Sequence, residues 1–600
     1  MARKKKEEKK EYEWSEYQKK IFDFIEHGQG NLVVEASAGA GKTSTLVKCL
    51  DFIPKDKKVL LVAFNKDIVN VLSKKTKEYD NVEVRTLHSL GLKMIKSNVG
   101  DGIKGEPEVF KYDAYIRNNL KELSSINIFK LKGSERYRYT ENIKKYINFG
   151  RCYLCQTVKD LNFIEERYEI DTIADEKEVA IDALRWGRNV LETLDYGDMV
   201  WLPTALNLKP YGALYDFIFI DECQDLNKAE RELILRCVKM GTRIFSFGDA
   251  FQTVYSFSGS DPQSFEALKN IPNTTSLPLS ISYRCADSIV DFAKKIVPSI
   301  EHNGDGRIGA IKYDVPLSDI KDGDMILCRN NAPLIQIYNE FLKMGKKCYI
   351  MGKDIGSNLK NVVKSTKKDE LNISCLKDGV FARLYDDIFS ERDKMMVRCC
   401  IDKKSAMESQ PIQDRLDMIR ALEVLSDGLR TAEELETRID EIFPKRDKKN
   451  GIALSTIHKA KGLEADNVYI VCRSLMPSKS AKKDWEKAQE QNLIYVAYTR
   501  AKNTLGFIDE KDFESFTMGE NAEKKLQYIE SLTNRLYGKD KLLPISSPKD
   551  AEEIIKKARK VTTRIQSSAT ISMNEAKETN KINNFSDILR RRTKKITIKR

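Results

Sequence analysis

The sequence lacks the features that mark secreted and membrane-spanning proteins. Its 12 cysteines are scattered through 600 residues without regular spacing, which favours a reducing compartment over a disulfide framework. No apolar run approaches the roughly 18 residues that a membrane-spanning helix needs, and no apolar segment follows the basic residues at the start of the chain. We therefore expect no secretory signal and no membrane partner. We expect a protein of the bacterial or phage-infected cytoplasm, or of the nucleus in a eukaryote.

Paired metal ligands are also scarce. Cys152 and Cys155 form a C-x-x-C with no second pair nearby, whereas a structural zinc site needs four ligands. Because residues three positions apart share a helix face, we interpret both cysteines as core residues of one helix.

Most of the chain has no excess of either charge. Residues 541–600 hold 16 Lys and Arg against 6 Asp and Glu, residues 1–20 hold 8 against 5, and the net charge of the whole chain is +13. The excess therefore belongs to the two ends, which is compatible with nucleic acid and equally with solvated tails. The polar composition after residue 541 predicts a largely disordered tail. It is also a candidate segment for binding a replication or repair protein.

A phosphate loop near the start is the most informative stretch. An apolar run at 32–34 leads into residues 36–43, which fit G-x-x-x-x-G-K-[ST] with Ala36 in place of the first glycine. Small residues let several backbone N–H groups point at one anion, and the following helix adds partial positive charge. Lys42 can reach the β and γ phosphates, and Thr43 offers a hydroxyl to Mg²⁺. A chance small-residue turn is the alternative.

Several later apolar runs end in polar residues. The apolar run at 59–63 leads to Phe64, and the strand pattern Val-Glu-Val-Arg at 82–85 leads towards His88. The run at 215–220 leads directly into Asp221 and Glu222. Ligand-binding groups gather at the carboxyl ends of strands in open parallel sheets. Asp221 is a candidate second-shell Mg²⁺ ligand, and Glu222 could deprotonate a water that attacks the γ-phosphate. Taken alone, Phe64 is equally consistent with a core residue and a functional one. His88 alone is more typical of a structural histidine.

Taken in chain order, these residues resemble the superfamily 1 helicases of the UvrD/PcrA/Rep type over about residues 14–510. Residues 63–66 and 195–199 look like the smaller branch of F-box helicases and phage relatives. The matching motifs are the phosphate loop, D-E-x-Q-D at 221–225, G-D-x-x-Q-x-x-Y at 248–255, Y-R at 283–284, T-x-H-x-x-K-G-L-E at 456–464, and Y-V-A-x-T-R-A at 495–501.

The resemblance implies an α/β fold with two RecA-like P-loop cores, each a parallel sheet flanked by helices and each carrying a helical insertion. The domains expected from it, and from the composition of the ends, are a basic arm (1–11), a first ATP-binding core (12–91 and 193–275) with a helical insertion (92–192), a second core (276–375 and 448–540) with a short helical insertion (376–447), and a basic tail (541–600).

The resemblance also implies roles for single residues. Glu222, Lys42, Gln252, Arg284 and Arg500 would be catalytic, with Glu222 as the base, Gln252 as the sensor of the γ-phosphate and the two arginines as fingers from the second core. Thr43 and Asp221 would hold Mg²⁺. ATP would lie against Gln18, Ala36, Ser37, Ala38, Gly39, Ala40, Gly41, Lys42, Thr43, Ser44, Tyr283 and Glu464, with the Tyr283 ring stacked on the adenine. DNA would lie against Phe64, Asn65, Thr86, His88, Tyr255, Phe257 and His458. From helical spacing alone, Gln18 would instead face solvent.

We therefore predict an ATP- and Mg²⁺-dependent DNA helicase that moves 3′ to 5′ on single-stranded DNA, acts at junctions with duplex and is monomeric. Its expected roles lie in replication, repair or recombination. Relatives often have Trp-Arg where this chain has Phe257-Ser258, so the grip on the strand could be weaker. The alternatives are a translocase that strips proteins from single strands and unwinds poorly, and a nucleic-acid-binding scaffold switched by ATP. RNA is a less expected track.

Overall fold

The computed structural model places its described residues in two compact units. One comprises Met1–Asp369 and Arg420–Lys525, and the other Glu370–Ile419 and Leu526–Arg600. The described residues are 13–100, 102–103, 106–126, 133–209, 214–256, 259–261, 263–351, 353–371, 378–399, 401–443, 451–508 and 520–537. Among these residues, no helix combines the length and the apolar character that crossing a bilayer demands.

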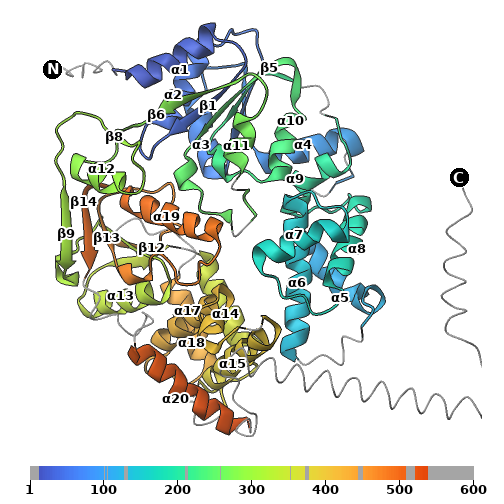
Figure 1. The fold of residues 1–600 in the computed structure, drawn as a ribbon, viewed down its shortest axis with the longest axis vertical. Helices are drawn as coiled ribbons and strands as arrows, with labels where there is room; N and C mark the ends of the chain where they lie inside the picture. Colours follow the sequence, from blue (N-terminus) through green and yellow to red (C-terminus); the bar gives the residue numbers. More distant parts are fainter. Residues whose placement is uncertain are drawn as a thin grey trace, which may run out of the picture. The chain divides into compact units, whose positions relative to one another are not determined.

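A six-stranded sheet, with every neighbouring pair parallel, forms the first half of the larger unit (Figure 1). Its order, β3-β2-β4-β5-β1-β6, places the first strand of the chain inside the sheet. All five residues of β2 are buried, as expected for a strand covered on both faces. The strands are β1 (Asn31–Ala36), β2 (Val59–Ala63), β3 (Val82–Thr86), β4 (Tyr215–Ile220), β5 (Val238–Gly248) and β6 (Thr274–Leu279).

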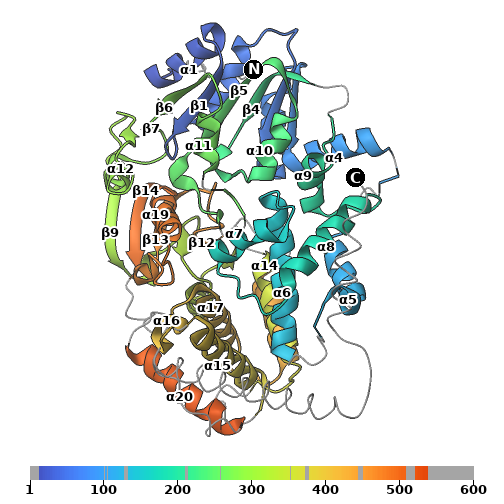
Figure 2. The same cartoon turned by 45° about the vertical axis from the view of Figure 1, so that its right-hand side comes forward.

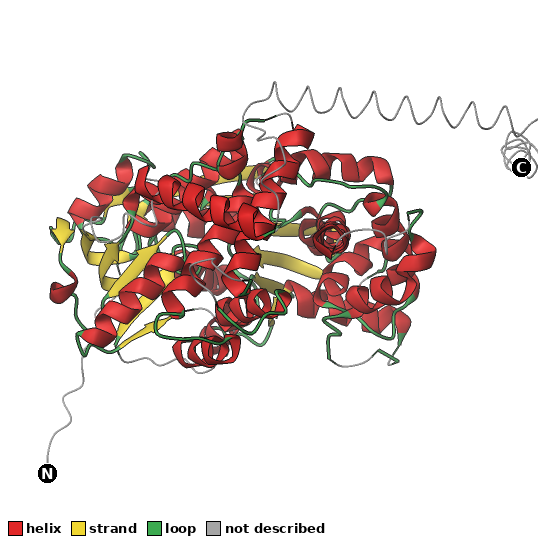
Figure 3. Ribbon diagram, turned by 90° about the horizontal axis from the view of Figure 1, so that it is seen from below, coloured by secondary structure: helices red, strands yellow, loops and turns green. Residues whose placement is uncertain are grey.

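A second sheet of six parallel strands lies in the same unit, in the order β11-β12-β10-β13-β14-β9. Helices lie against the strands in the view from below (Figure 3). The two parallel sheets flanked by helices confirm the predicted α/β fold class. The strands are β9 (Ala310–Val315), β10 (Met325–Cys328), β11 (Cys348–Ile350), β12 (Ile452–Thr456), β13 (Ala465–Ile470) and β14 (Ala501–Ile508).

Several helices of the sheet regions begin at a side-chain cap. Helix α1 (Glu16–His27) begins with a capping box in which the Ser15 side chain accepts from the Gln18 N–H and the Gln18 side chain accepts from the Ser15 N–H, which satisfies two otherwise orphan donors. The remaining helices of these regions are α2 (Lys42–Cys49), α3 (Lys66–Lys75), α10 (Lys228–Leu235), α11 (Ser264–Lys269), α12 (Asp287–Lys294), α13 (Ala332–Lys343), α14 (Lys353–Ser365), α18 (Ala432–Ile442) and α19 (Asp484–Tyr498).

A helical insertion with its own buried core interrupts the first sheet (Figure 2). Helix α6 ends at Cys152 and Leu154 is left-handed, with φ of 59°, so Cys155 does not continue the helix face that we predicted. Cys155 is nevertheless buried, whereas Cys152 is partly exposed. The helices are α4 (Leu87–Val99), α5 (Lys111–Leu123), α6 (Gly133–Cys152), α7 (Val158–Tyr168), α8 (Glu176–Asn189) and α9 (Tyr196–Ala205).

The smaller unit is helical in its described part. It contains α15 (Val380–Cys399), α16 (Lys403–Met407), the first part of α17 (Gln410–Leu425) and most of α20 (Glu520–Leu536). Glu530 of α20 pairs with Arg392 at 2.6 Å and with Lys403 at 2.7 Å. The end of α20 therefore packs with residues 370–419. The sequence-based expectation instead places all of 448–540 in the second core.

Candidate functional site

The predicted phosphate loop connects β1 to α2. Gly39 and Gly41 have φ of +76° and +78°, a left-handed conformation that glycine adopts without strain. A Cβ on Gly39 would lie 2.5 Å from the Arg284 Cβ, so the loop also needs a glycine where residue 284 approaches. The Ala38 N–H donates to the Tyr495 hydroxyl at 2.9 Å. The loop thus lies between the two parallel sheets, at the carboxyl end of β1. Ala36, Ser37, Ala38 and Ala40 of the loop are buried, and Ser44 is exposed.

Lys42 lies at the start of α2 and is partly exposed, but its Nζ is buried. Its Nζ is 2.8 Å from Oε1 of Glu222, but no hydrogen bond of good geometry satisfies this buried nitrogen. Burial alone would lower the pKa of Lys42, yet the charges of Glu222, Asp221 and Asp249 raise it. A buried ammonium that lacks a well-aligned acceptor, beside loop N–H groups at a helix N-terminus, fits a phosphate group.

The two acidic residues predicted at the end of β4 are side by side, with Asp221 buried and Glu222 partly exposed. Glu222 is left-handed, with φ of 53°, and its N–H donates to Oδ1 of Asp221 at 3.0 Å. Burial and the neighbouring Glu222 charge raise the pKa of Asp221. Burial alone would raise the pKa of Glu222, but the charges of Lys42 and Lys461 hold it low. Glu222 is therefore the ionised member of the pair, as a general base must be.

Gln252 connects the first sheet to an arginine of the second. The Gln252 Nε2 donates to Oδ2 of Asp249 at 2.6 Å, and Oε1 of Gln252 accepts from Arg500 at 3.4 Å. Arg500 is 1% exposed, and its burial together with the Arg284 charge lowers its pKa to about 10. A buried guanidinium is thus already beside the side chain predicted to sense the γ-phosphate.

Arg284 and Glu464, both predicted at the ATP site, are paired with each other. The Arg284 Nε is 2.7 Å from one carboxylate oxygen of Glu464, and Lys502 is 2.8 Å from the other. The carboxylate is therefore occupied by two cations. The Tyr283 N–H donates to the Gly39 carbonyl at 2.9 Å, which brings the predicted adenine-stacking residue next to the phosphate loop.

Gln18 is fully buried rather than solvent-facing, so the interpretation from helical spacing is wrong. Its Nε2 donates to the Thr45 hydroxyl at 2.9 Å and lies 3.7 Å from where a Cβ on Gly41 would be. Burial follows from α1 packing on α2, which the spacing of apolar residues within α1 does not reveal.

A buried lysine, to which we assigned no role from the sequence, links the two sheets. Lys461 Nζ is 2.5 Å from Oδ2 of Asp225, donates to the Gln252 carbonyl at 2.6 Å and lies 5.0 Å from the Tyr255 ring centroid. Asn492 donates across the same junction to the Thr253 carbonyl at 3.0 Å. Lys461 belongs to the T-x-H-x-x-K-G-L-E motif at 456–464. The spacing of that motif does not show that the Lys461 side chain reaches the first sheet.

Two of the aromatic residues predicted to bind DNA lie together. The rings of Phe64 and Tyr255 are nearly parallel, with centroids 6.1 Å apart, and the Tyr255 hydroxyl donates to the His458 carbonyl at 3.1 Å. Burial lowers the pKa of His458 to about 3, so its imidazole is neutral at pH 7. Phe257 lies outside the described residues.

The remaining predicted DNA residues begin helices or lie beside them. The Asn65 and Thr86 side chains accept from backbone N–H groups and cap α3 and α4. Burial lowers the pKa of His88, whose ring meets the edge of Tyr196 at 5.7 Å. Tyr196 is 54% exposed and lies in the D-Y-G-D-M stretch, yet sequence reasoning did not single it out.

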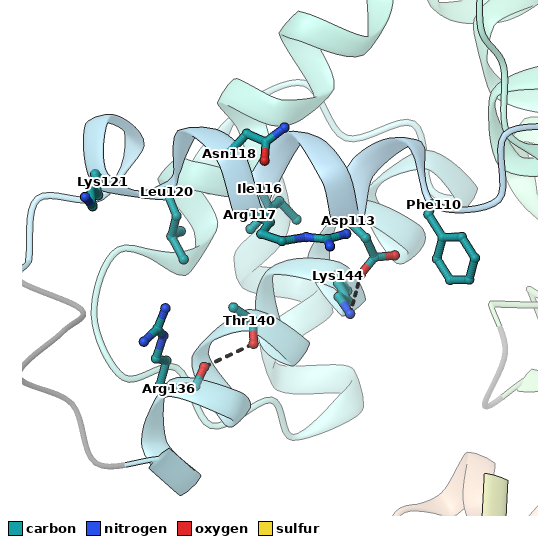
Figure 4. A pocket seen from close by; sticks show the side chains of 10 residues that line it. All are labelled: Phe110, Asp113, Ile116, Arg117, Asn118, Leu120, Lys121, Arg136, Thr140 and Lys144. Atoms are coloured by element: carbon teal, nitrogen blue, oxygen red, sulfur yellow. Dashed lines mark hydrogen bonds and ion pairs between the residues drawn. The ribbon is translucent and has the colours of Figure 1, made fainter. Parts of the chain in front are cut away.

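A pocket of about 700 Å³ lies elsewhere, on the helical insertion (Figure 4). Side chains of α5 and α6 line it, including the ion pair of Lys144 with Asp113 and the exposed Arg117. None of the predicted site residues lines this pocket, so its size does not identify it as the functional site.

Comparisons with known proteins identify the family. The model of the UvrD/REP helicase N-terminal domain matches residues 17–272, and that of the UvrD-like helicase C-terminal domain matches residues 357–511. F-box DNA helicase protein 1 of Schizosaccharomyces pombe is 27% identical over 79% of this chain and 55% of its own length. ATP-dependent DNA helicase Rep of Buchnera aphidicola subsp. Baizongia pistaciae is 26% identical over 48% of this chain and 43% of its own length. ATP-dependent DNA helicase PcrA of Staphylococcus aureus (strain Mu50) is 22% identical over 80% of this chain and 81% of its own length. The chain thus spans about half the length of the first two relatives.

Proposed function

The chain belongs to the UvrD/Rep family of helicases, and on that premise we propose that it is an ATP-dependent DNA helicase that moves 3′ to 5′ on single-stranded DNA and unwinds duplex DNA. The observation that carries the proposal is the junction around Lys461. This one buried ammonium contacts the Asp-Glu motif through Asp225, the backbone of Gln252 and the ring of Tyr255. It would therefore tie a predicted ATP-site element to a ring predicted to contact DNA.

The residues present fit ATP and Mg²⁺. The loop from Gly39 to Thr43 with Lys42 would hold the phosphates, Thr43 and Asp221 would hold Mg²⁺, and the adenosine would lie against Gln18, Tyr283 and Glu464. When bound, ATP with Mg²⁺ supplies the phosphoryl group whose hydrolysis drives the cycle.

The protein's own groups set the conditions for that hydrolysis. Lys42 pairs with Glu222 in this structure, and a base neutralised by a cation accepts a proton poorly. Glu222 becomes an effective base when Lys42 turns to phosphate oxygens instead. Arg284 and Arg500 then stabilise developing charge, a role worth roughly 10³–10⁵ in rate for arginine fingers. Arg284 must leave Glu464 to do so, which couples catalysis to movement of the second core.

The single strand would lie across Phe64 and Tyr255, with Phe257 as a further ring. Stacking on an aromatic ring is worth about 1–3 kcal/mol per base and tolerates every sequence. Such contacts suit a motor that must bind and release all sequences. Thr86, His88, Asn65 and His458 would contact the backbone. Because His458 is neutral, it would do so as a hydrogen-bonding group rather than as a cation.

The same site also supports weaker forms of the proposal. A translocase that strips proteins and unwinds little would share every ATP-site contact, and the Phe257-Ser258 departure favours that variant. An ATP-switched scaffold would need a disabled base, yet the carboxylate of Glu222 is present and ionised. We propose a monomer that acts in replication, repair or recombination, with residues 541–600 as a segment that contacts DNA or a partner protein.

Strand displacement from tailed duplexes tests the proposal. A labelled 18-base-pair duplex with either a 3′ or a 5′ single-stranded tail is incubated with ATP, with Glu222→Gln as the inactive control. Displacement from the 3′-tailed substrate alone is the expected result. Release of streptavidin from a biotinylated single strand without duplex displacement would favour the stripping translocase. Displacement from the 5′-tailed substrate alone would refute the polarity.

A further inference from the structure

A short loop outside the predicted motifs is built around one arginine. It spans 303–309, between β8 (Glu301–His302) and β9. Asn303 and Asp305 bond each other twice, with the Asn303 Nδ2 donating at 2.7 Å and the Asp305 N–H donating at 2.9 Å. The carboxylate of Asp305 then accepts from the backbone N–H and from Nε of Arg307, at 3.0 and 2.6 Å. The Asn303 amide and the Arg307 N–H hold the pKa of Asp305 at about 2, so it is ionised and fixes the guanidinium.

The other two nitrogens of that guanidinium reach the Y-R motif. NH2 donates to the carbonyl of Tyr283 at 2.9 Å, and NH1 donates to the carbonyl of Arg284 at 3.2 Å. The backbone completes the contact, because the N–H groups of Asp287 and Ser288 donate to the carbonyls of Arg307 and Ile308 at 2.7 and 2.9 Å. The loop therefore holds the main chain from residue 283 to residue 288.

The phosphate loop holds the same segment from the other direction. The Tyr283 N–H donates to the Gly39 carbonyl, and the Arg284 Cβ is so near that a Cβ on Gly39 would lie 2.5 Å away. Tyr283 thus has its N–H on the phosphate loop and its carbonyl on Arg307.

We propose that Arg307 is a positioning residue for the nucleotide site. It fixes the main-chain conformation of Tyr283 and Arg284. It thereby sets the direction in which the adenine-stacking ring and the arginine finger point. The inference rests on the proposed function for the roles of those two side chains. It does not rest on that function for the clamp itself, which is defined by the hydrogen bonds of Arg307.

The chemistry of the clamp requires arginine. One planar fork bonds a carboxylate and two carbonyls at once, with charge-assisted hydrogen bonds that have fixed directions. A lysine at this position carries the same charge on one nitrogen and reaches one of these partners at a time. Arg307→Lys therefore keeps the charge and loses the clamp, which separates positioning from simple electrostatics.

Hydrogen exchange of the nucleotide-free protein tests the clamp directly. In Arg307→Gln, we expect faster exchange in peptides that cover residues 280–288, with Arg307→Lys close to Gln and Asp305→Asn between them and the wild type. Lys312→Gln is the matched control, because Lys312 is an exposed cation on β9. Unchanged exchange in Arg307→Gln would overturn the clamp whatever the activity, and thermal unfolding checks that each variant is folded.

Kinetics then test the positioning. Loss of a charge-assisted hydrogen bond corresponds to about a tenfold effect or more, and we expect a rise of that size in the KM for ATP. We also expect a smaller preference for ATP over CTP, because the stacking ring is misplaced, and little change in single-strand affinity. Faster exchange with wild-type KM and nucleotide preference would overturn the positioning role. A wild-type protein without ATPase activity would refute the proposed function instead, while the exchange data would still decide the clamp.

Discussion

Replacing Lys461 by Met should separate DNA stimulation from basal ATP turnover. The Lys461 side chain is 8% exposed and that of Asp225 is 1% exposed, and methionine keeps the apolar length while removing the charge. Asp225 would then be a buried carboxylate without its cation. Breaking a buried pair by removing one partner costs about 3–5 kcal/mol.

That cost falls on the joined arrangement, the conformation in which the two sheet regions contact each other, because Asp225 follows β4 of the first sheet and Lys461 follows β12 of the second. A loss of about 3 kcal/mol reduces the population of the joined arrangement by over a hundredfold. If single-stranded DNA stimulates turnover by favouring that arrangement, the stimulated kcat should fall by about the same factor. Basal turnover should change much less, since on this reasoning only the DNA-stimulated rate depends on the joined arrangement.

The assay is steady-state ATP hydrolysis with and without poly-dT for four proteins: the wild type, Lys461→Met, Asp225→Asn and the double variant. The double variant removes both charges, so it should recover part of the lost stimulation, with a coupling energy of at least about 1 kcal/mol. Lys487→Met is the control, because Lys487 forms a 3.5 Å pair with Asp484 on the exposed surface of α19 and such pairs contribute little. Full stimulation in Lys461→Met, or strictly additive effects in the double variant, would refute the reasoning.

Four further predictions follow from single contacts. Lys42→Ala should abolish turnover and leave single-strand affinity intact in a fluorescence-anisotropy titration, and loss of both would contradict separate sites. Tyr255→Ala should weaken single-strand binding by about 1–3 kcal/mol with unchanged nucleotide affinity, whereas an unchanged Kd for poly-dT would remove Tyr255 from the strand site. The His458 imidazole, with its pKa at about 3 against an ordinary 6.5, should stay neutral in ¹³C NMR titrations down to pH 5. Because its folded pKa is depressed, its stabilising effect is complete above pH 6.5 and declines towards pH 3, and an NMR midpoint near 6.5 would contradict its burial. Gly91→Ala should destabilise the protein by about 1–3 kcal/mol, because the new Cβ would lie 1.8 Å from the Met199 carbonyl oxygen, and an unchanged thermal midpoint would contradict that packing.

The fold class and the centre of the ATP site could be predicted from sequence because their signals are local. A phosphate loop needs small residues and a lysine within a few positions, and Asp221 with Glu222 follows an apolar run directly. The order of such motifs along the chain carries the resemblance to the helicase family, and that resemblance implied two parallel sheets. The roles of the individual residues in ATP and DNA binding stay predictions until the variants above are measured.

Contacts between distant segments could not be predicted in the same way. Lys461 and Asp225 are 236 positions apart, and no spacing rule indicates which lysine reaches which carboxylate. Gln18 looked solvent-facing because helical periodicity describes one helix and not what packs on it. Arg307 lies outside every motif, and its function as a clamp is visible only when its nitrogens are traced to the carbonyls of residues 283 and 284.

Local structure also gives Asn65 and Thr86 a second explanation. Both cap helices through their side-chain oxygens, which is what these residue types do at helix starts. Capping and DNA contact are compatible, because the capping oxygen leaves the Asn65 amide nitrogen available. Variants at Asn65 and Thr86 should therefore be measured for both protein stability and DNA affinity.

The most direct test of the motor is ATP hydrolysis measured with and without single-stranded DNA, wild type beside Glu222→Gln. We expect poly-dT to stimulate ATP hydrolysis strongly in the wild type. We expect Glu222→Gln to lose this stimulation while it still binds the strand. Turnover that is indifferent to DNA, or unchanged by removing the carboxylate of Glu222, would contradict a DNA-driven motor with this residue as its base.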